Sequence, residues 1–317
     1  MTHAHPHDAD PRSTRVAGYL FALGAGALWG TTGPLSTKLY AEGAAITGIG
    51  FWRILLGTCV LLVYGAFHRS IFDIDRKGWL IVGLGGGSLI ALFEVAYQFG
   101  IAGAGVAGAA ALLYTAPVLV AILAKPLLGE SLTARRLALA VVVMAGAALT
   151  VWGGSHGAGL TGVPMPSLVA GVAGGIFAAL AYAGGTLIAR WSVPRYGEMR
   201  VLLLEIGGGT LVLGIVLPLV GHAPAPPPTV GGWVYLVVLV VCAVLGANYL
   251  FFAGTRRIDA APAAVAATIE PVVGTLLALF LLNQRLTIIG WIGLAMVVGG
   301  VAGGYLADAR TSRAPAS

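Results

Sequence analysis

The stretch PVLVAILAKPLLGESLT at residues 117–133 returns as PVVGTLLALFLLNQRLT at residues 271–287. The two stretches lie 154 residues apart and agree at eight of their 17 positions. The similarity weakens upstream but continues, because at the same offset Gly100 aligns with Gly254 and Glu94 aligns with Asn248. The chain therefore contains two copies of one unit.

The composition places this repeated unit in a membrane. Of the 317 residues, 58% are hydrophobic and only 9% are charged, and the mean hydropathy is +0.92. A soluble domain carries about 25% charged residues, because its surface faces water. The 48 glycines are typical of membrane helices that approach one another closely. The net charge of +6 comes from basic residues scattered singly or in pairs between apolar runs, which argues against a nucleic-acid partner.

Ten apolar runs are long enough to cross a bilayer, which takes about 20 residues of helix. We therefore predict an all-α integral membrane protein with ten transmembrane helices in two five-helix repeats. The repeats cover residues 16–153 and 167–306. They are joined by an external linker at 154–166 and flanked by a disordered N-terminal tail at 1–15 and a C-terminal tail at 307–317. The runs are 16–37, 45–66, 79–100, 104–128, 134–153, 167–190, 199–220, 232–254, 259–282 and 287–306.

The two repeats are expected to cross the membrane in opposite directions, because each holds an odd number of spans. Basic residues agree with this topology. With the N-terminus in the cytoplasm, 15 of the 18 Lys and Arg residues fall on the inner side, where the positive-inside rule places them. Only Lys38 and Arg285 fall outside, and Arg53 lies within a span. We expect a multi-pass protein of the plasma membrane with both termini cytoplasmic.

An inverted repeat is typical of secondary transporters, because it supplies two related packings that open to opposite sides. The sequence has no GxxxxGK[ST] run for ATP. We therefore expect a small-molecule substrate, carried by alternating access and driven by an ion or substrate gradient. A coupling proton and membrane lipids are the other expected partners, and no cofactor or metal is expected. Whether the protein forms a homo-oligomer is left open.

Three motifs resemble one known family. They are Gly-Ala-Leu-Trp-Gly at 26–30, Phe-Trp-Arg at 51–53 and Gly-Glu-x-Leu-Thr at 129–133, and they are similar to those of EamA-type proteins of the drug/metabolite transporter superfamily. The resemblance covers both repeats. It implies an exporter of amino acids or related small metabolites, with a cavity lined by the first four helices of each half and a peripheral fifth helix. In the second half the last motif is weakened to Asn283-Gln284-x-Leu286-Thr287. Glu130 is expected to cap or pin its own loop and to take no part in transport.

Ionisable groups inside a span are costly, and each is therefore a candidate for function. Arg53 and Glu94 are predicted at one level near the outer face, where they can form an ion pair. Glu205 and Asn248 share a level near the inner face. Two interpretations stay open. These pairs line or gate the cavity at its two ends, or they are structural contacts that pin helices together.

Glu270 differs from these pairs because it is predicted near the middle of the membrane, directly before Pro271. Proline removes a backbone hydrogen bond and can free carbonyl groups for a ligand. Glu270 could carry the coupling proton or hold a substrate amine. The alternative is a protonated side chain that hydrogen-bonds to a neighbouring helix. The matching position in the first half is Ala116, so this carboxylate breaks the symmetry of the repeat.

Polar-tipped and aromatic residues in the same helices are further candidates for substrate contacts, since such side chains suit a mostly apolar cavity. They are Trp29, Tyr97, Gln98, Tyr114 and Tyr182. A flippase of lipids or lipid precursors is the alternative function, because it could share this architecture. An intramembrane enzyme is disfavoured, since no histidine lies in a predicted span to serve as an acid or base.

Overall fold

The computed structural model describes residues 11–154, 165–282 and 287–311. Every regular element in these ranges is a helix, in agreement with the predicted all-α class. Six helices are long and apolar enough to cross a membrane, and two apolar helices are shorter. Among the described residues, length and composition alone therefore identify fewer helices than the ten predicted spans. The six are Thr47–Phe67, Arg76–Tyr97, Val169–Tyr196, Glu198–Leu219, Val230–Thr255 and Ile288–Leu306, and the shorter two are Ala116–Leu128 and Ala260–Gly274.

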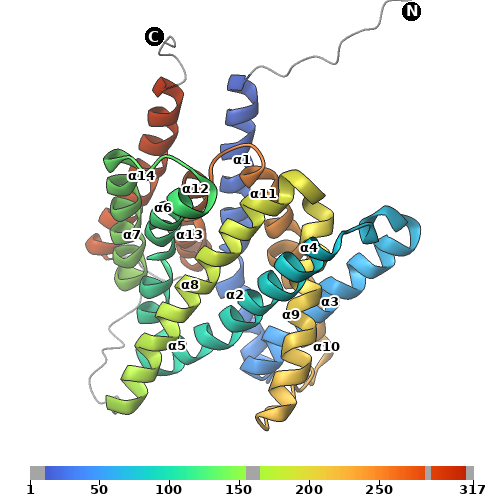
Figure 1. The fold of residues 1–317 in the computed structure, drawn as a ribbon. Helices are drawn as coiled ribbons and strands as arrows, with labels where there is room; N and C mark the ends of the chain where they lie inside the picture. Colours follow the sequence, from blue (N-terminus) through green and yellow to red (C-terminus); the bar gives the residue numbers. More distant parts are fainter. Residues whose placement is uncertain (1–10, 155–164, 283–286, 312–317) are drawn as a thin grey trace, which may run out of the picture.

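The elements of the two halves follow one another in a similar order (Figure 1). The first half holds α1 (Pro11–Trp29), α2 (Thr32–Ala41), α3 (Ile46–Phe67), the short 3-10 turn η1 (Arg69–Phe72), α4 (Arg76–Gly78), the π-helical η2 (Trp79–Gly86), α5 (Gly87–Leu113), α6 (Ala116–Leu128) and α7 (Ala134–Gly154). The second half holds α8 (Met165–Tyr196), α9 (Glu198–Leu219), α10 (Val230–Leu239), the π-helical η3 (Val240–Gly246), α11 (Ala247–Thr255), α12 (Ala260–Ala267), α13 (Glu270–Leu282) and α14 (Ile288–Thr311).

Prolines set the helix breaks that the hydropathy pattern did not predict. A proline ring clashes with the carbonyl group four residues earlier. Four residues before Pro117 is Leu113, where α5 ends, and four before Pro271 is Ala267, where α12 ends. The predicted gap at 101–103 is therefore wrong, because α5 continues to Leu113. The predicted span 259–282 is interrupted after Ala267 for the same reason, and the span 16–37 is divided between α1 and α2.

The ends of the chain also differ from the prediction. Helix α1 begins at Pro11, so residues 11–15 are helical and not part of the tail. Proline suits a first helical position because that position needs no N–H donor. Helix α14 continues to Thr311, beyond the predicted end of the last span. Most of the predicted linker and Arg285 lie outside the described residues.

The repeat is visible in matching helix caps. Asp75 Oδ1 accepts a hydrogen bond of 2.7 Å from Gly78 N, and 154 residues later Thr229 Oγ1 accepts one of 2.9 Å from Gly232 N. Each cap also contacts the other half, since Tyr196 Oη donates to Asp75 Oδ1 at 2.8 Å. Both hydrogen bonds hold the pKa of Asp75 below its usual value, and the bond from the Gly78 N–H has the larger effect.

The cap of α10 makes the corresponding contact with the first half. Thr229 Oγ1 donates a hydrogen bond to Glu42 Oε2 at 2.5 Å. Glu42 and Tyr196 are themselves 154 residues apart. The two halves are therefore joined twice by equivalent side chains.

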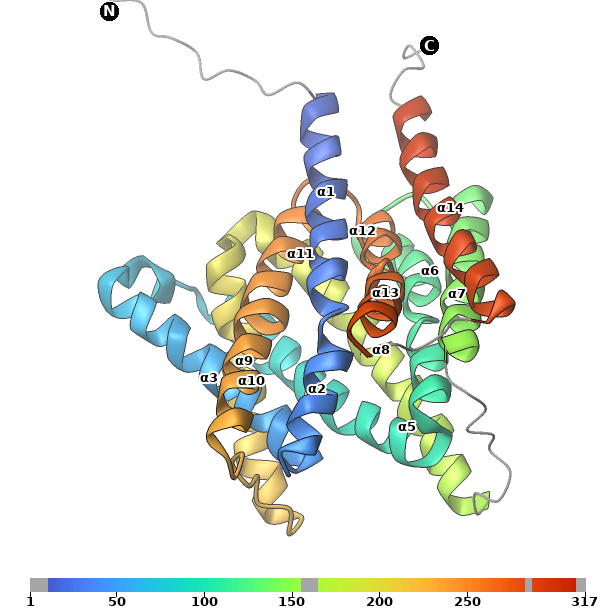
Figure 2. The same ribbon diagram turned by 180° about the vertical axis from the view of Figure 1, so that it is seen from behind.

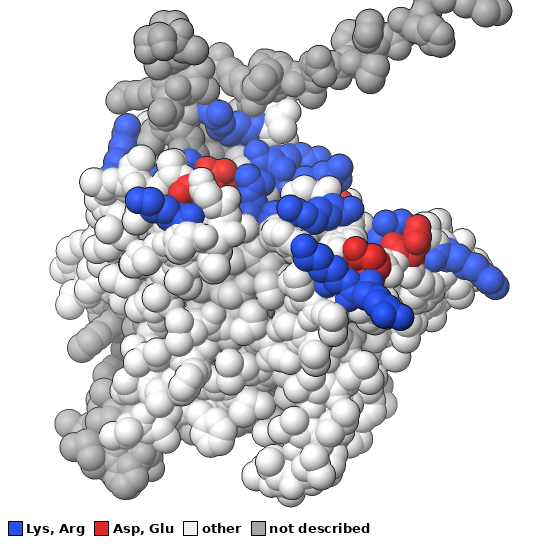
Figure 3. All heavy atoms as spheres, viewed as in Figure 1, with Lys and Arg blue, Asp and Glu red and all other residues white. Residues whose placement is uncertain are grey.

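The outside of the bundle is divided by charge. Large apolar side chains are widely exposed, as at Val63 and Leu211, which suits a surface covered by lipid. Lys and Arg gather at the end where α1 begins and α14 ends, and the opposite end carries none in this view (Figures 2 and 3). We call this end the basic face. We assign to it the basic residues at the matching helix ends and connections, which are Arg69, Arg76, Lys77, Arg136, Arg190, Arg195, Arg200, Arg256 and Arg257.

Glycine lets α1 pass close to the break after α12. A Cβ atom added at Gly26 would collide with the carbonyl oxygen of Ala267 and would lie 2.8 Å from Ile269 Cγ2. We expect Gly26→Ala to lower the free energy of unfolding by about 1–3 kcal/mol, because overpacked interiors force such shifts. Thermal unfolding of the purified protein measures this loss. Gly185→Ala is the control, since no atom of another described helix lies within 4 Å of a Cβ there. Equal melting of both variants would contradict the close approach.

Candidate functional site

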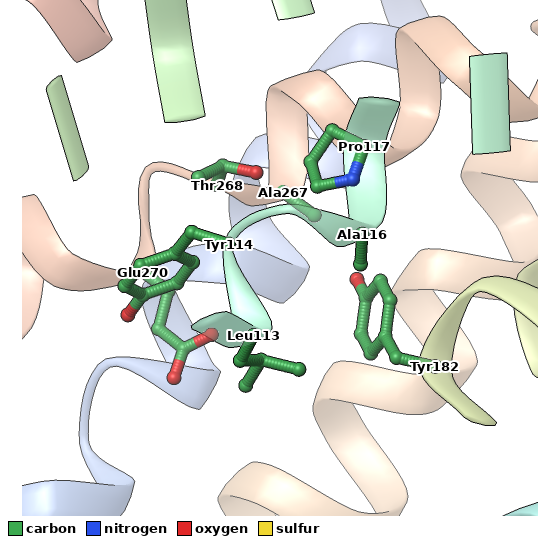
Figure 4. Close-up of a pocket in the computed structure, with 8 residues that line it drawn as sticks. All are labelled: Leu113, Tyr114, Ala116, Pro117, Tyr182, Ala267, Thr268 and Glu270. Carbon is green, nitrogen blue, oxygen red and sulfur yellow. The ribbon is translucent and has the colours of Figure 1, made fainter. Parts of the chain in front are cut away.

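The two proline-directed breaks meet at one cavity. Its walls are the Tyr114 break between α5 and α6, the Thr268 break between α12 and α13, and one residue of α8. The cavity measures about 20 Å³, which is room for about one water molecule. Tyr182 faces Tyr114 and Glu270 across it (Figure 4). The lining residues are Leu113, Tyr114, Ala116, Pro117, Tyr182, Ala267, Thr268 and Glu270.

Each break is built from local backbone chemistry. Thr115 Oγ1 donates to the Leu112 carbonyl oxygen at 2.6 Å, and Thr268 Oγ1 donates to that of Ala264 at 2.9 Å. These hydroxyl groups satisfy carbonyls near the ends of α5 and α12. Helices α6 and α13 both begin at the cavity, and helix N-termini carry partial positive charge. Interrupted helices at equivalent positions of two repeats mark binding sites in transporters.

Glu270 brings the carboxylate into this cavity. It is the first residue of α13, and no hydrogen bond or ion pair of its side chain is found among the described residues. Glu270 lies within electrostatic reach of Arg53 and of the hydroxyl groups of Tyr97, Tyr114 and Tyr182. The predicted alternative, a hydrogen bond from Glu270 to a neighbouring helix, is absent from this part of the structure. The carboxylate is therefore available to an incoming group.

Aromatic rings pack behind Tyr182, the α8 residue that lines the cavity. The Trp29 ring lies 6.0 Å from that of Tyr182 and 5.2 Å from that of Phe251. Trp29 is held by its Nε1, which donates to the Ala243 carbonyl oxygen at 3.0 Å. That carbonyl belongs to the π-helical segment η3, where the regular helix bonding is altered. Phe251 was not predicted, because its position in an apolar run resembles that of any core residue.

Three of the predicted contacts lie elsewhere or cannot be placed. Trp29 does not line the cavity and packs behind Tyr182. Tyr97 does not line the cavity, and its ring stacks on that of Phe93 with centroids 5.6 Å apart. The side chain of Gln98 lies outside the described residues. Thr268 lines the cavity but was not predicted. The alignment of Pro117 with Pro271 was the signal that could have identified it.

Arg53 and Glu94 form an ion pair between Arg53 Nη2 and Glu94 Oε1, as their shared level suggested. The Glu94 side chain is 6% exposed and that of Arg53 is 18% exposed. Gly50 leaves room for the carboxylate, since a Cβ there would lie 3.2 Å from Glu94 Oε2. The pair joins α3 to α5. Because Arg53 also acts on Glu270, the pair lies within electrostatic reach of the cavity.

Glu205 and Asn248 do not form the matching second pair. Asn248 Nδ2 donates to the carbonyl oxygens of Val244 at 2.8 Å and Ala243 at 3.3 Å. Its amide is thus used by the π-helical segment four to five residues earlier. Glu205 is buried against Gly86, and its Oε1 has no hydrogen-bond partner in the described residues. The mirror symmetry predicted for the polar pairs therefore fails at this level.

The fold and cavity define a multi-pass helical membrane protein with a polar site where two repeats meet, which is the organisation of a membrane transporter. Residues 16–152 and 169–305 each match the EamA-like transporter family. The chain belongs to this family, which is part of the drug/metabolite transporter superfamily. The two matched segments correspond to the two repeats.

Individual relatives agree with this assignment. An uncharacterized transporter of Archaeoglobus fulgidus is 25% identical over 269 residues, covering 85% of this chain and 90% of the relative. The uncharacterized transporter YwfM of Bacillus subtilis is 24% identical over 287 residues, covering 89% and 91%. A solved crystal structure superposes with a TM-score of 0.76 at 23% identity, covering 95% of this chain and all of that one. At this identity the last likeness concerns the fold alone.

Proposed function

We propose that this protein is a secondary transporter that exports amino acids or related small metabolites by alternating access. The two matched segments act as inverted five-helix repeats of a ten-helix protein in the plasma membrane. The basic face lies in the cytoplasm, since cytoplasmic loops hold an excess of Lys and Arg. Both termini then lie on that side.

One observation carries this proposal. Equivalent helix breaks from the two repeats enclose a cavity that holds an unpaired carboxylate, that of Glu270. A charge within a membrane is costly and persists where it serves a ligand or ion pathway. The cavity is far smaller than a typical ligand pocket, which measures about 300–1,000 Å³. A substrate therefore has room to bind only when the breaks separate.

Glu270 has one of two roles in this mechanism. It holds the amine of a substrate, with Tyr114 and Tyr182 around the bound molecule, or it carries a coupling proton that the substrate displaces. Trp29 supports this wall through Tyr182. If the export rate does not respond to an imposed pH gradient, the proton-coupling role is excluded and the amine-binding role remains.

The test compares small molecules in the medium of cells that express the wild type, Glu270→Gln or an empty vector. Glutamine keeps the size of the side chain and removes its charge. We expect a few amino acids or related metabolites to accumulate outside with the wild type, and at least tenfold less with Glu270→Gln. The control is Glu198→Gln, which removes a carboxylate paired with Arg256 Nη1 at 3.2 Å on the basic face.

A different result would contradict the exporter. If the media of cells with the wild type, Glu270→Gln and the empty vector contain the same small molecules, export of soluble metabolites is refuted. Movement of a labelled lipid between bilayer leaflets by the purified protein would then identify a flippase.

A further inference from the structure

The strongest polar cluster outside the cavity joins the two repeats at the basic face. It consists of Glu130 and Arg136 from the first repeat and Arg190 and Asp259 from the second. Glu130 lies between α6 and α7, Arg136 lies in α7, Arg190 lies in α8, and Asp259 precedes α12. Four helices are thus tied together by four charged side chains. We call this cluster the ion lock.

Arg190 is the centre of the ion lock. Its Nε donates to Glu130 Oε1 at 3.0 Å and its Nη2 to Asp259 Oδ1 at 3.1 Å. Its Nη1 donates to the carbonyl oxygen of Thr255, at the end of α11, at 2.6 Å. A guanidinium group presents its donors in a rigid fork, so one arginine can hold three acceptors at once. A lysine could not do this with the same geometry.

The remaining oxygens of both carboxylates are also used. Asp259 Oδ2 accepts from Arg136 Nη2 at 2.9 Å. Glu130 Oε1 and Oε2 accept from the N–H of Ala260 at 3.0 and 3.1 Å. Ala260 is the first residue of α12, so Glu130 caps a helix of the other repeat. The side chain thus ties its own loop to the other repeat, and these partners were not predicted.

The ion lock is connected to the cavity by two helices. Helix α12 runs from Ala260 at the lock to Ala267 in the cavity wall, and α6 runs from Ala116 in that wall to Leu128 beside the lock. Buried apolar side chains fill the space between them. They are Val120, Ala121, Ala124, Ala183, Leu187, Ala260, Ala261 and Ala264. The lock and both breaks are thus joined by one continuous packed cluster.

The equivalent positions on the opposite side carry no charge. At the offset of 154 residues, Glu130 corresponds to Gln284, Arg136 to Gly290, Arg190 to Ser36 and Asp259 to Gly105. Inverted repeats would give both sides equal closure if their sequences were equal. At these four positions the sequence therefore supplies ion pairs to the basic face alone.

We propose that the ion lock is the gate of the basic face, and that it makes the conformation closed on that face the resting state of the transporter. This inference rests on the proposed alternating-access function. Opening toward the basic face requires α6 to part from α12, and this separates Glu130 from Ala260 and Arg190. The opposite side opens without breaking any ion pair between equivalent positions.

The lock is sensitive to the loss of one member. The Glu130 side chain is 9% exposed and that of Arg190 is 24% exposed. Burial raises the pKa of Glu130, while its bonds from Ala260 and Arg190 act in the opposite direction. Removing Arg190 leaves two carboxylates without their shared partner, and an uncompensated buried charge destabilises the arrangement that holds it.

Thiol labelling from one side tests the gate without measuring transport. Cys59 is first replaced by serine and Cys242 by alanine. The substitution Ala267→Cys then places a reporter thiol in the cavity wall. A membrane-impermeant maleimide is added to vesicles that expose the basic face, an orientation verified with a separate Arg69→Cys protein. We expect Glu130→Gln and Arg190→Gln each to raise the labelling rate at least tenfold, which equals about 1.4 kcal/mol toward the open state.

Two controls make this result specific. Arg256→Gln removes the exposed pair with Glu198 within the second repeat, and its labelling rate should stay within about twofold of the starting protein. Vesicles of the opposite orientation should show no increase for any lock variant. Size-exclusion profiles and melting curves establish that each variant is folded.

Unchanged labelling in both folded lock variants would overturn the gate, as would an increase from the opposite side. If one variant does not fold, Asp259→Asn replaces it, because it also removes a carboxylate from Arg190. If the wild type exports nothing but the lock variants still show increased labelling, the gate is supported and the proposed exporter is refuted.

Discussion

Replacing both Pro117 and Pro271 with alanine is expected to reduce export at least tenfold while leaving the protein folded. A proline inside a helix costs about 3 kcal/mol relative to alanine. Without the two rings, α5 can continue into α6 and α12 into α13, because the carbonyls of Leu113 and Ala267 regain helical partners. The cavity is made from these breaks. Straight helices would therefore remove the site while keeping the bundle.

The measurement combines export with thermal unfolding of the purified variant. We expect the melting temperature to stay equal or to rise, which separates a lost site from a lost fold. Pro126→Ala is the matched control, since Pro126 lies inside α6 near its far end and away from the cavity. Full export by the double variant would show that the breaks are not needed for transport.

The sequence was sufficient for the class, the repeat and one polar pair. Its hydropathy identified membrane helices because lipid-facing residues must be apolar along a whole span. The offset of 154 residues identified the repeat, and Arg53 and Glu94 could be paired because both depths follow from helix rise. These are properties that depend on local sequence or on a single periodicity.

The helix breaks could have been predicted but were not. Both prolines are plain in the sequence, and Pro271 directly follows Glu270. Hydropathy alone does not detect a two-residue interruption, since the residues on both sides of each break are mostly apolar. The rule that a proline disturbs the residue four positions earlier would have placed the ends at Leu113 and Ala267.

The ion lock depends on contacts that hydropathy and repeat alignment do not specify. Arg190 is 60 residues from Glu130, and Ala260 is 130 residues from it. The Gly-Glu-x-Leu-Thr motif drew attention to Glu130, but its partners lie in the other repeat. Only the packing of α6 against α12 shows that the motif acts across the interface between the repeats.

The Arg53–Glu94 ion pair allows the structural and functional interpretations of the predicted polar gate to be separated. We expect Arg53→Met alone to destabilise the protein by about 3–5 kcal/mol, because it leaves Glu94 buried without a partner. The Glu94 side chain is only 6% exposed, so water cannot compensate for the lost arginine. Adding Glu94→Leu should recover most of this loss, since a buried pair is often replaceable by apolar side chains of similar volume.

Export by the double variant then decides the role of the pair. Arg53 acts electrostatically on Glu270, so its removal changes the charge balance of the cavity even when the fold is restored. We expect Arg53→Met with Glu94→Leu to melt close to the wild type and to export at least tenfold less. Normal export by this stable variant would instead make the pair a structural contact between α3 and α5. A double variant as unstable as Arg53→Met would contradict the argument from the unpaired charge, because neither charge would then remain.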